Sequence, residues 1–464
     1  MDGFDREVLT RLPLAKAVLS VLGYVCDDGY LNDVFDRHRG RCYERDLKFS
    51  NVVELIGDAL LEHQGSARKA FRQGRKQNRL PVTDQAAYGK LRRLPLEVSQ
   101  GFLAMTASRL QELFPDQVTT PLPSSLKNLQ VFAVDGKKLK KLAKRLKAAR
   151  GVEGKVLGGK TLVARDLHLG IAVAMEAHPD GEANDGPLVP GLLKQIVELY
   201  PEESCLWILD SQFCDLTTPK RILSQGHDFL VRYHPKVQFH RANSYQVREG
   251  IDERGRKYRE EIGRLGSPNN KLANRPLVRR ITVFRPGDDD LILITSLVDM
   301  DTFPATDLLE AYAARWTIET MFQHVTEVFC LQRLIGGTAQ ASVFQCGFCL
   351  LLFNIIHLLR IYLSIQHGRE ADEFSMQNVF DDVHSELTVI RVLLPTRQIV
   401  SEFGDHSNAY HVRRRLQSLL KSTWADHWLK APNNHRAPPA PRKKIPGSHT
   451  SIHRLIERYD AQFQ

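Results

Sequence analysis

The sequence has 464 residues, more than the roughly 250–300 that one hydrophobic core usually holds, so two or three domains are expected. Hydrophobic residues make up 42% and charged residues 25% of the chain, which is typical of globular proteins and excludes a mostly disordered or fibrous chain. The 64 Lys and Arg residues exceed the 54 Asp and Glu residues and leave a formal charge of +10, which makes a polyanion such as nucleic acid a candidate partner.

The N-terminal part of the chain has the pattern of a helical domain. Asn51 followed by Glu54 predicts a capping box that opens a helix running through Leu61. Basic residues recur at positions 37–48 and 68–79. Each basic group is interpreted equally well as a solvated helix face or as a DNA-contacting surface. We therefore expect residues 1–120 to form a helical N-terminal DNA-binding domain.

An α/β pattern begins after a proline- and serine-containing boundary at residues 121–125. An apolar strand at 131–136 ends in Asp135 and Gly136, and residues 161–175 suit one or two further strands. Residues 188–199 suit a helix, and 206–210 form another apolar strand that ends in Asp210. Strands that alternate with a helix at this spacing indicate an α/β layer architecture.

The segment at 228–300 has a different texture. Short alternating runs at 229–234, 245–248 and 278–284 are separated by Gly, Asn and Asp clusters, which predicts an antiparallel sheet. A strand at 291–297 follows. A strong helix is then expected after Pro304, with Thr306 as its N-cap and with Asp307 and Glu310 in its first turn, where the helix dipole favours negative charge.

The C-terminal part contains the most apolar stretch of the sequence, residues 347–365. Asn354, His357 and Arg360 interrupt it at helical spacing, and its uninterrupted part is shorter than a membrane span, so we expect a buried helix and no membrane partner. Cys346 and Cys349 are interpreted as buried core cysteines rather than zinc ligands. The seven cysteines lack dense spacing, which indicates a reducing compartment.

The tail of the chain is proline-rich and basic at 432–446 and is expected to be extended.

Three carboxylates carry the chemistry that the pattern suggests. Asp135 and Asp210 end apolar strands, and ligands gather at strand carboxyl ends in open α/β sheets. Glu319 lies on the helix after Thr306 at spacings that place several side chains on one face. The residues that share this face are Tyr312, Arg315, Trp316, Glu319, Phe322 and Gln323. Ordinary turn residues and a Glu319–Arg315 ion pair are the alternative interpretations.

Three converging carboxylates match the oxygen-rich binding of Mg²⁺. Two divalent ions held by such groups, about 3.5–4 Å apart, stabilise both oxygens of an in-line phosphodiester displacement. We therefore predict two Mg²⁺ ions per active site, for which Mn²⁺ can substitute, held by Asp135, Asp210 and Glu319. Tyr312 and Arg315 would hold phosphates near the metals. Asp166, Asp180 and Asp185 are rivals for the second ligand.

The densest basic run lies at 137–150, directly after Asp135. It suits DNA phosphates that pass the active site, although a solvated helix face is the usual interpretation of a charge run. The residues that we expect to contact DNA in this run are Lys137, Lys138, Lys140 and Lys141.

These residues resemble those of DDE transposases of the insertion-sequence-four type. The motif of that family is a tyrosine, an arginine three positions later, a glutamate four positions after the arginine and a lysine seven positions after the glutamate. Tyr312, Arg315 and Glu319 match it in identity and spacing. The lysine position holds Thr326 instead. The resemblance also includes Asp135 within Val-Asp-Gly and Asp210 within Leu-Asp-Ser-Gln-Phe. It covers roughly residues 125–365, and the 109 residues between Asp210 and Glu319 fit the β-rich insertion of the family.

The resemblance implies an α/β fold with a ribonuclease-H-like core. We expect a catalytic domain at 125–345 with the β-rich insertion at about 228–300, and a helical C-terminal region with a basic tail at 346–464. The implied function is a transposase that binds the ends of an insertion sequence and cleaves and joins DNA strands. Its expected partner is double-stranded DNA, both element ends and target, bound by a homodimer.

The expected location is the cytoplasm of a bacterium, at the nucleoid. An inactive transposase-derived DNA-binding protein and a metal-dependent nuclease are the alternative functions.

Overall fold

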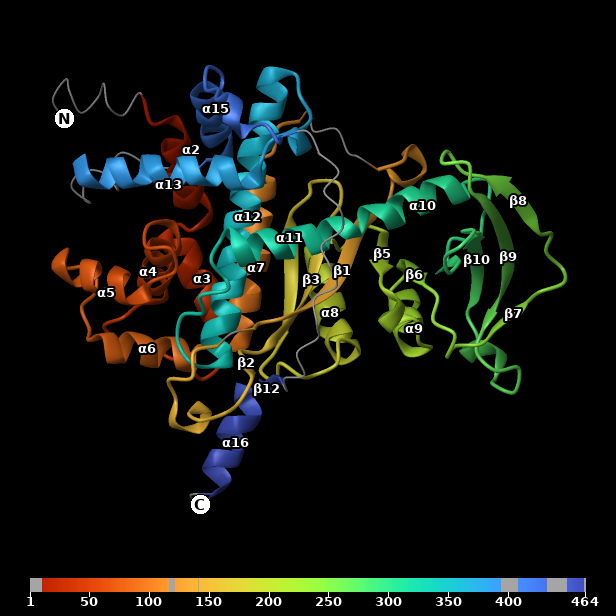
Figure 1. Ribbon diagram of the computed structural model, residues 1–464, viewed down its shortest axis with the longest axis horizontal. Helices are drawn as coiled ribbons and strands as arrows, with labels where there is room; N and C mark the ends of the chain where they lie inside the picture. Colours follow the sequence, from red (N-terminus) through yellow and green to blue (C-terminus); the bar gives the residue numbers. More distant parts are fainter. Residues whose placement is uncertain (1–10, 117–121, 141, 394–407, 432–448, 463–464) are drawn as a thin grey trace.

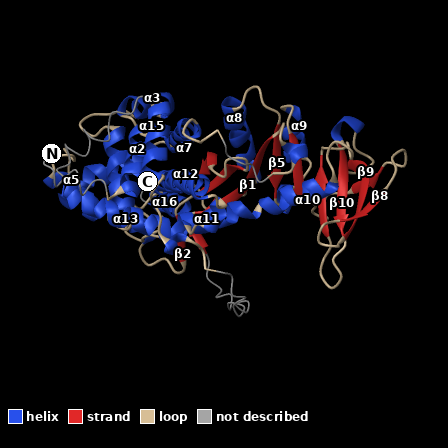
Figure 2. Ribbon diagram, turned by 90° about the horizontal axis from the view of Figure 1, so that it is seen from above, coloured by secondary structure: helices blue, strands red, loops and turns tan. Residues whose placement is uncertain are grey.

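The computed structural model describes residues 11–116, 122–140, 142–393, 408–431 and 449–462. The protein is a mixed α/β protein, with helices gathered at one end and a large mixed sheet that extends to the other (Figures 1 and 2). Lys141 and the proline-rich basic segment at 432–446 lie outside the described residues.

The helices before the sheet are α2 (Pro13–Val25), α3 (Asp28–His38), α4 (Phe49–Leu61), α5 (Ala67–Lys76), α6 (Asp84–Arg93) and α7 (Leu96–Gln111). The predicted end of α4 at Leu61 is confirmed, but its predicted start is wrong. Asn51 lies inside the first turn, where its Oδ1 accepts a hydrogen bond from the backbone N–H of Lys48 at 3.2 Å. The helix begins at Phe49 because the N-cap is Lys48, whose backbone N–H is bound by Asn51 in the third helical position.

A ten-stranded sheet forms the centre of the molecule, in the order β4-β3-β1-β5-β6-β11-β10-β9-β7, with β8 paired to β9. Its strands are β1 (Gln130–Lys138), β3 (Lys160–Asp166), β4 (Ala172–His178), β5 (Cys205–Leu209), β6 (Asp228–Arg232), β7 (Phe239–Arg241), β8 (Arg248–Ile251), β9 (Lys257–Leu265), β10 (Leu277–Val283) and β11 (Leu291–Thr295). β1 is antiparallel to β3 and parallel to β5, and β5 is parallel to β6. The α/β pattern predicted for the segment before residue 210 is thus observed.

The segment at 228–300 forms an antiparallel sheet for most of its length. β7 and β8 both pair with β9, and β9, β10, β11 and β6 follow one another in antiparallel order. Two details differ from the prediction. β6 also pairs with β5 in parallel, so its residues continue the preceding α/β layer, and the strand expected at 245–248 begins only at Arg248.

Helices cover both faces of the parallel strands (Figure 2). α8 (Val189–Leu199) and α9 (Thr217–Ser224) lie on one side, and α10 (Ala305–Ala314) and α11 (Trp316–Glu327) lie on the other. The single helix expected from Thr306 is therefore two helices that meet at Arg315. Pro304 precedes α10 as its N-cap, so Thr306 lies inside the helix and does not cap it.

The apolar run in the C-terminal part forms α12 (Ala339–His367), which is long and apolar enough to cross a membrane by length and composition. Its side chains are largely buried within the fold. Asn354 donates to and accepts from the backbone of Ala172 at 2.7 and 2.8 Å, and the Nε2 of His357 lies 3.1 Å from the Leu169 oxygen. The interpretation as a buried helix is confirmed, because its polar residues bind the sheet edge.

Further elements complete the C-terminal part: α13 (Met376–Leu393), α15 (Ala409–Leu420), α16 (Ile452–Gln462) and the small parallel pair of β2 (Lys155–Leu157) and β12 (His449–Ser451). Cys346 and Cys349 are fully buried, as expected of core cysteines. α7 packs against α12, where the rings of Phe102 and Phe348 stack 5.8 Å apart. One hydrophobic core therefore joins the N-terminal helices, α12 and the sheet.

Candidate active site

The carboxyl ends of two neighbouring parallel strands bring Asp135 and Asp210 together. Val134 of β1 pairs with Leu209 of β5 in parallel register. The residues that follow, Asp135 and Asp210, therefore stand side by side, because paired strands lie about 4.8 Å apart. Residues in register on parallel strands also point to the same face of the sheet. The predicted convergence of these two carboxylates is thus supported by the strand pairing.

The backbone next to each aspartate fixes its side chain. Asp135 Oδ1 accepts a hydrogen bond from the Gly136 N–H at 2.8 Å, and Asp210 Oδ1 accepts one from the Ser211 N–H at 2.6 Å. Gly136 is required for a steric reason, since a Cβ at this position would lie 2.3 Å from Asp185 Oδ1. The two carboxylates therefore have the same local geometry at adjacent strand ends.

The three rival acids are engaged elsewhere. Asp166 is fully buried and accepts two backbone N–H groups in the turn after β3. Asp180 pairs with Arg454 at 2.8 Å, and Asp185 forms a buried pair with Lys160 at 2.7 Å. Each of these carboxylates has a structural partner of its own.

Glu319 lies in the first turn of α11, which runs across the sheet (Figure 1), and its charge acts on Asp135. The prediction that the residues around Glu319 share one face of a single helix is only partly correct. Tyr312 and Phe322 are buried, but Trp316 is 60% exposed and Gln323 is also exposed. The buried face is centred on neighbouring positions and runs through Ala311, Arg315, Ile318, Phe322 and Val325. At the junction of α10 and α11 the Arg315 N–H binds the Tyr312 oxygen three residues back at 3.1 Å.

Arg315 is the cation that the chain itself supplies to these acids. Its guanidinium is buried and its NH2 lies 2.9 Å from Glu319 Oε1. The ion pair that was the alternative interpretation of Glu319 is therefore present. The Arg315 Nε has no hydrogen-bond partner among the described residues. The guanidinium carbon lies 5.7 Å from the Tyr312 ring centre and 5.3 Å from that of Trp316.

Burial and like charges perturb the ionisation of Asp135. Burial raises the pKa of its carboxyl from 3.8 to about 6; the Gly136 N–H and Arg315 oppose the rise, and the charges of Glu319 and Asp210 add to it. Burial likewise raises the pKa of the Tyr312 hydroxyl, which Arg315 partly offsets and Asp210 reinforces. Asp135, Asp210 and Glu319 therefore act on one another electrostatically around Arg315.

The donor set fits a hard divalent cation. Asp135, Asp210 and Glu319 offer carboxylate oxygens, the ligands that a hard divalent cation prefers, and the first two stand at adjacent strand ends. Within the described ranges, however, no three acidic, histidine or cysteine side chains lie close enough together to share one ion. Glu319 instead binds Arg315, as expected of a carboxylate next to a guanidinium. A metal ion shared by all three carboxylates would therefore require Glu319 to move toward the two aspartates.

Lys137 has a different environment from the one expected of a phosphate contact. Its ammonium donates to the Thr326 hydroxyl at 2.7 Å and to the Phe322 carbonyl at 3.0 Å, and it lies 4.9 Å from the Phe322 ring centre. Burial lowers the pKa of Lys137. Lys138 and Lys140 are exposed. Among its described residues, the basic run consists of the end of β1, a loop and the short 3-10 helix Lys147–Ala149, so no continuous helix presents these cations.

The contact between Lys137 and Thr326 could not be seen in the sequence. It ties β1, two residues beyond Asp135, to α11, seven residues beyond Glu319. Arg232 was also missed. Val231 of β6 pairs with Leu209, so the exposed Arg232 stands beside Asp210 at the third strand end. A charged residue that ends an apolar strand was the available signal for Arg232.

The fold and site define a class: a mixed α/β domain with aspartates at adjacent strand ends and a glutamate on a later helix. Residues 127–355 match the family model described as "Transposase DDE domain". The segment that carries Asp135, Asp210 and Glu319 is therefore similar to a transposase DDE domain.

Among solved structures, the chain is similar to the piggyBac transposase in a cryo-EM structure of its synaptic complex with hairpin DNA. The sequences are 11% identical, the TM-score is 0.40, and the match covers 84% of this chain and 85% of that chain. No curated protein matches the sequence.

Proposed function

We propose that the protein is a bacterial transposase of the insertion-sequence-four type, which binds the ends of its element and catalyses metal-dependent strand cleavage and strand transfer. The observation that carries this proposal is the register between β1 and β5. It aligns Asp135 with Asp210 at the carboxyl ends of adjacent strands, where the charges of Arg315 and Glu319 act on Asp135. The transposase DDE match over residues 127–355 agrees with it.

Asp135, Asp210 and Glu319 are the residues that would hold two Mg²⁺ or Mn²⁺ ions. Bound there, the ions would activate a water or a 3′-hydroxyl and stabilise the leaving oxygen. Arg315, once released by Glu319, would offer its unpartnered Nε and a second N–H to a phosphate oxygen pair. Tyr312 would position the Arg315 guanidinium, since its buried ring lies beside it.

Lys137 is assigned a positioning role, because its ammonium is already occupied by α11. It fixes the distance between the strand that carries Asp135 and the helix that carries Glu319. The exposed Lys138 and Lys140 remain candidates for phosphate contacts, together with Lys141.

A ribonuclease-H-like core is part of the proposal. The strand order β4-β3-β1-β5-β6, with β3 antiparallel between two neighbours and β1, β5 and β6 parallel, supports it. The antiparallel strands β7 to β10 would be the β-rich insertion before α10. A homodimer on double-stranded DNA, with the helical residues 1–120 on the element ends, would hold two ends together at the nucleoid.

The test uses DNA that carries the inverted repeats flanking the gene, incubated with the full-length protein in Mg²⁺, Mn²⁺ or EDTA. End-specific nicks and joined products are expected with either metal and not in EDTA. Asp135→Asn, Asp210→Asn and Glu319→Gln should each abolish both products. Glu310→Gln is the matched control, because Glu310 is exposed on α10, and it should retain activity.

Two other results would assign the protein differently. Specific binding without nicking in any metal would make it an inactive transposase-derived DNA-binding protein. Nicking without joined products would make it a metal-dependent nuclease.

A further inference from the structure

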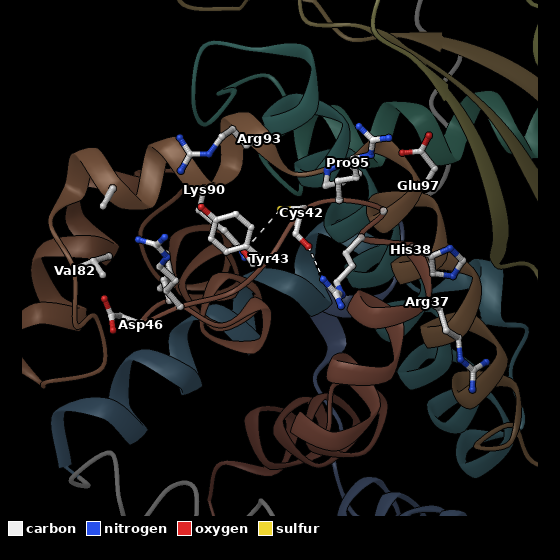
Figure 3. Close-up of a pocket in the computed structure, with 16 residues that line it drawn as sticks. Arg37, His38, Cys42, Tyr43, Asp46, Val82, Lys90, Arg93, Pro95 and Glu97 are labelled. Atoms are coloured by element: carbon white, nitrogen blue, oxygen red, sulfur yellow. Dashed lines mark hydrogen bonds between the residues drawn. The ribbon is translucent and has the colours of Figure 1, made fainter.

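A cationic pocket of about 1000 Å³ lies in the N-terminal helices, among the end of α3, the loop after it, α6 and the start of α7. Figure 3 shows its lining residues. Six of them are cationic and two are acidic: Arg37, Arg39, Arg41, Arg45, Lys90 and Arg93 against Asp46 and Glu97. Cations therefore outnumber acids in the lining, and the volume is large enough for a nucleotide.

Two of the cations hold the loop between α3 and α4 in place. Arg39 donates to the Cys42 carbonyl at 2.9 Å and pairs with Asp36 at 2.9 Å. The buried Lys90 ammonium lies 3.4 Å from the Tyr43 carbonyl and 4.5 Å from the Phe35 ring centre, and it pairs with Glu44 at 3.4 Å. The loop is thus anchored to both neighbouring helices and presents a preformed surface.

Three other cations are exposed and available. Arg37, Arg41 and Arg93 make no hydrogen bond or ion pair with any residue that the structure describes. Each guanidinium therefore keeps its full set of donors for an external anion, and phosphate oxygens match the planar guanidinium fork.

Tyr43 adds an aromatic surface to the same pocket. Its ring is 62% exposed, and the Arg45 guanidinium lies 5.2 Å from the ring centre. Figure 3 shows the Tyr43 ring between the helix that carries Lys90 and Arg93 and the helix that carries Arg37. An exposed ring among guanidinium groups is the arrangement on which unpaired bases stack while cations hold the backbone.

We propose that this pocket binds an unpaired segment of DNA strand, with its phosphates on Arg37, Arg41 and Arg93 and a base on Tyr43. A paired duplex would present its phosphates to the arginines but would keep its base faces inside the stack, out of reach of Tyr43. That the strand is DNA rests on the proposed function; the pocket chemistry itself selects a single-stranded nucleic acid.

The test measures binding of fluorescent oligo-dT, oligo-U of the same length and a blunt duplex to the full-length protein in EDTA. Tyr43→Ala should weaken oligo-dT binding by about fivefold or more, because stacking on one aromatic ring contributes roughly 1–3 kcal/mol per base. Tyr43→Phe keeps the ring and should bind like the wild type. Neither substitution should change duplex affinity by more than about twofold.

The salt dependence separates the arginines from the tyrosine. The double variant Arg41→Ala with Arg93→Ala should reduce the slope of log K against log salt for oligo-dT by about 1.4, or about 0.7 per lost phosphate contact. Tyr43→Ala should leave the slope unchanged. Arg221→Ala, an exposed cation on α9 outside the pocket, is the matched control and should change neither quantity.

Equal losses for oligo-dT and duplex in Tyr43→Ala, or no loss in any pocket variant, would overturn the proposal. Preference for oligo-U would assign the pocket to RNA and overturn it as well. Because binding is measured without metal, its outcome is independent of strand cleavage, so failure of the proposed transposase activity remains distinguishable from failure of this site.

Discussion

Asparagine at position 135 should make the metal-free protein more stable at neutral pH. The Asp135 pKa rises from 3.8 to about 6, chiefly because the carboxyl is buried. A change of one pKa unit corresponds to about 1.4 kcal/mol, so keeping Asp135 ionised costs the folded state roughly 3 kcal/mol at most. The side chain is only partly buried, and water screening lowers the expected gain to about 1–2 kcal/mol for Asp135→Asn.

The sign of the pH dependence follows from proton binding. Between about pH 4 and 6 the folded protein binds more protons at Asp135 than the unfolded chain does, so wild-type stability falls as the pH rises through this window. The advantage of Asp135→Asn should therefore be largest at pH 7.5, shrink by roughly half at pH 5 and vanish toward pH 4.

The assay is urea unfolding followed by tryptophan fluorescence, in EDTA, at pH 5.0, 6.0 and 7.5. Glu310→Gln removes an exposed carboxylate on α10 and serves as the control, with no stability change expected. Added Mg²⁺ should stabilise the wild type and leave Asp135→Asn unchanged. A variant that is less stable than the wild type at pH 7.5 would refute the reasoning, because it would mean that the ionised carboxylate is favourably compensated in the fold.

Three further substitutions test the surroundings of the site. Lys137→Met removes two charge-assisted hydrogen bonds to α11, so it should lower the free energy of unfolding by about 1–3 kcal/mol. Strand cleavage should fall while DNA affinity persists. Hydrogen exchange in α11 and nicking assays measure the two effects. Gly136→Ala places a Cβ 2.3 Å from Asp185 Oδ1 and should lower the melting temperature, whereas Gly186→Ala, which points into open space, should not. Arg315→Lys keeps the positive charge but loses the planar guanidinium fork, so strand cleavage should fall at least about tenfold. DNA affinity should stay within about twofold of the wild-type value. Nicking and binding assays measure the two quantities.

The strand ends were predictable because the chemistry there is local. An apolar run that stops at an aspartate is visible in the sequence, as in Val131 to Asp135 and Leu206 to Asp210. What the sequence does not contain is the pairing register. Only the alignment of Val134 with Leu209 places the two carboxylates side by side, and that alignment depends on contacts between residues 75 positions apart.

The helix carrying Glu319 was predicted with the right residues and the wrong continuity. A helical wheel gives the spacing of the residues on a face, but it does not say which face is buried: that face runs through Ala311, Arg315, Ile318, Phe322 and Val325. Trp316 therefore faces solvent although it is aromatic and apolar. A prediction from hydrophobicity alone places Trp316 in the core, because the sequence pattern gives the type of each residue but not the direction in which the folded helix points it.

The Arg315–Glu319 pair explains why the three carboxylates do not close around a common point within the described structure. Asp135 and Asp210 are held by their own backbone, so Glu319 is the member of the set whose partner can change. Removing Glu319 from Arg315 without replacement would leave a buried guanidinium and a carboxylate both uncompensated, which is costly. Under the proposed function, a cation would have to take Glu319 while a phosphate takes Arg315. The two exchanges cost least when they occur together, so DNA and metal should each favour binding of the other at this site.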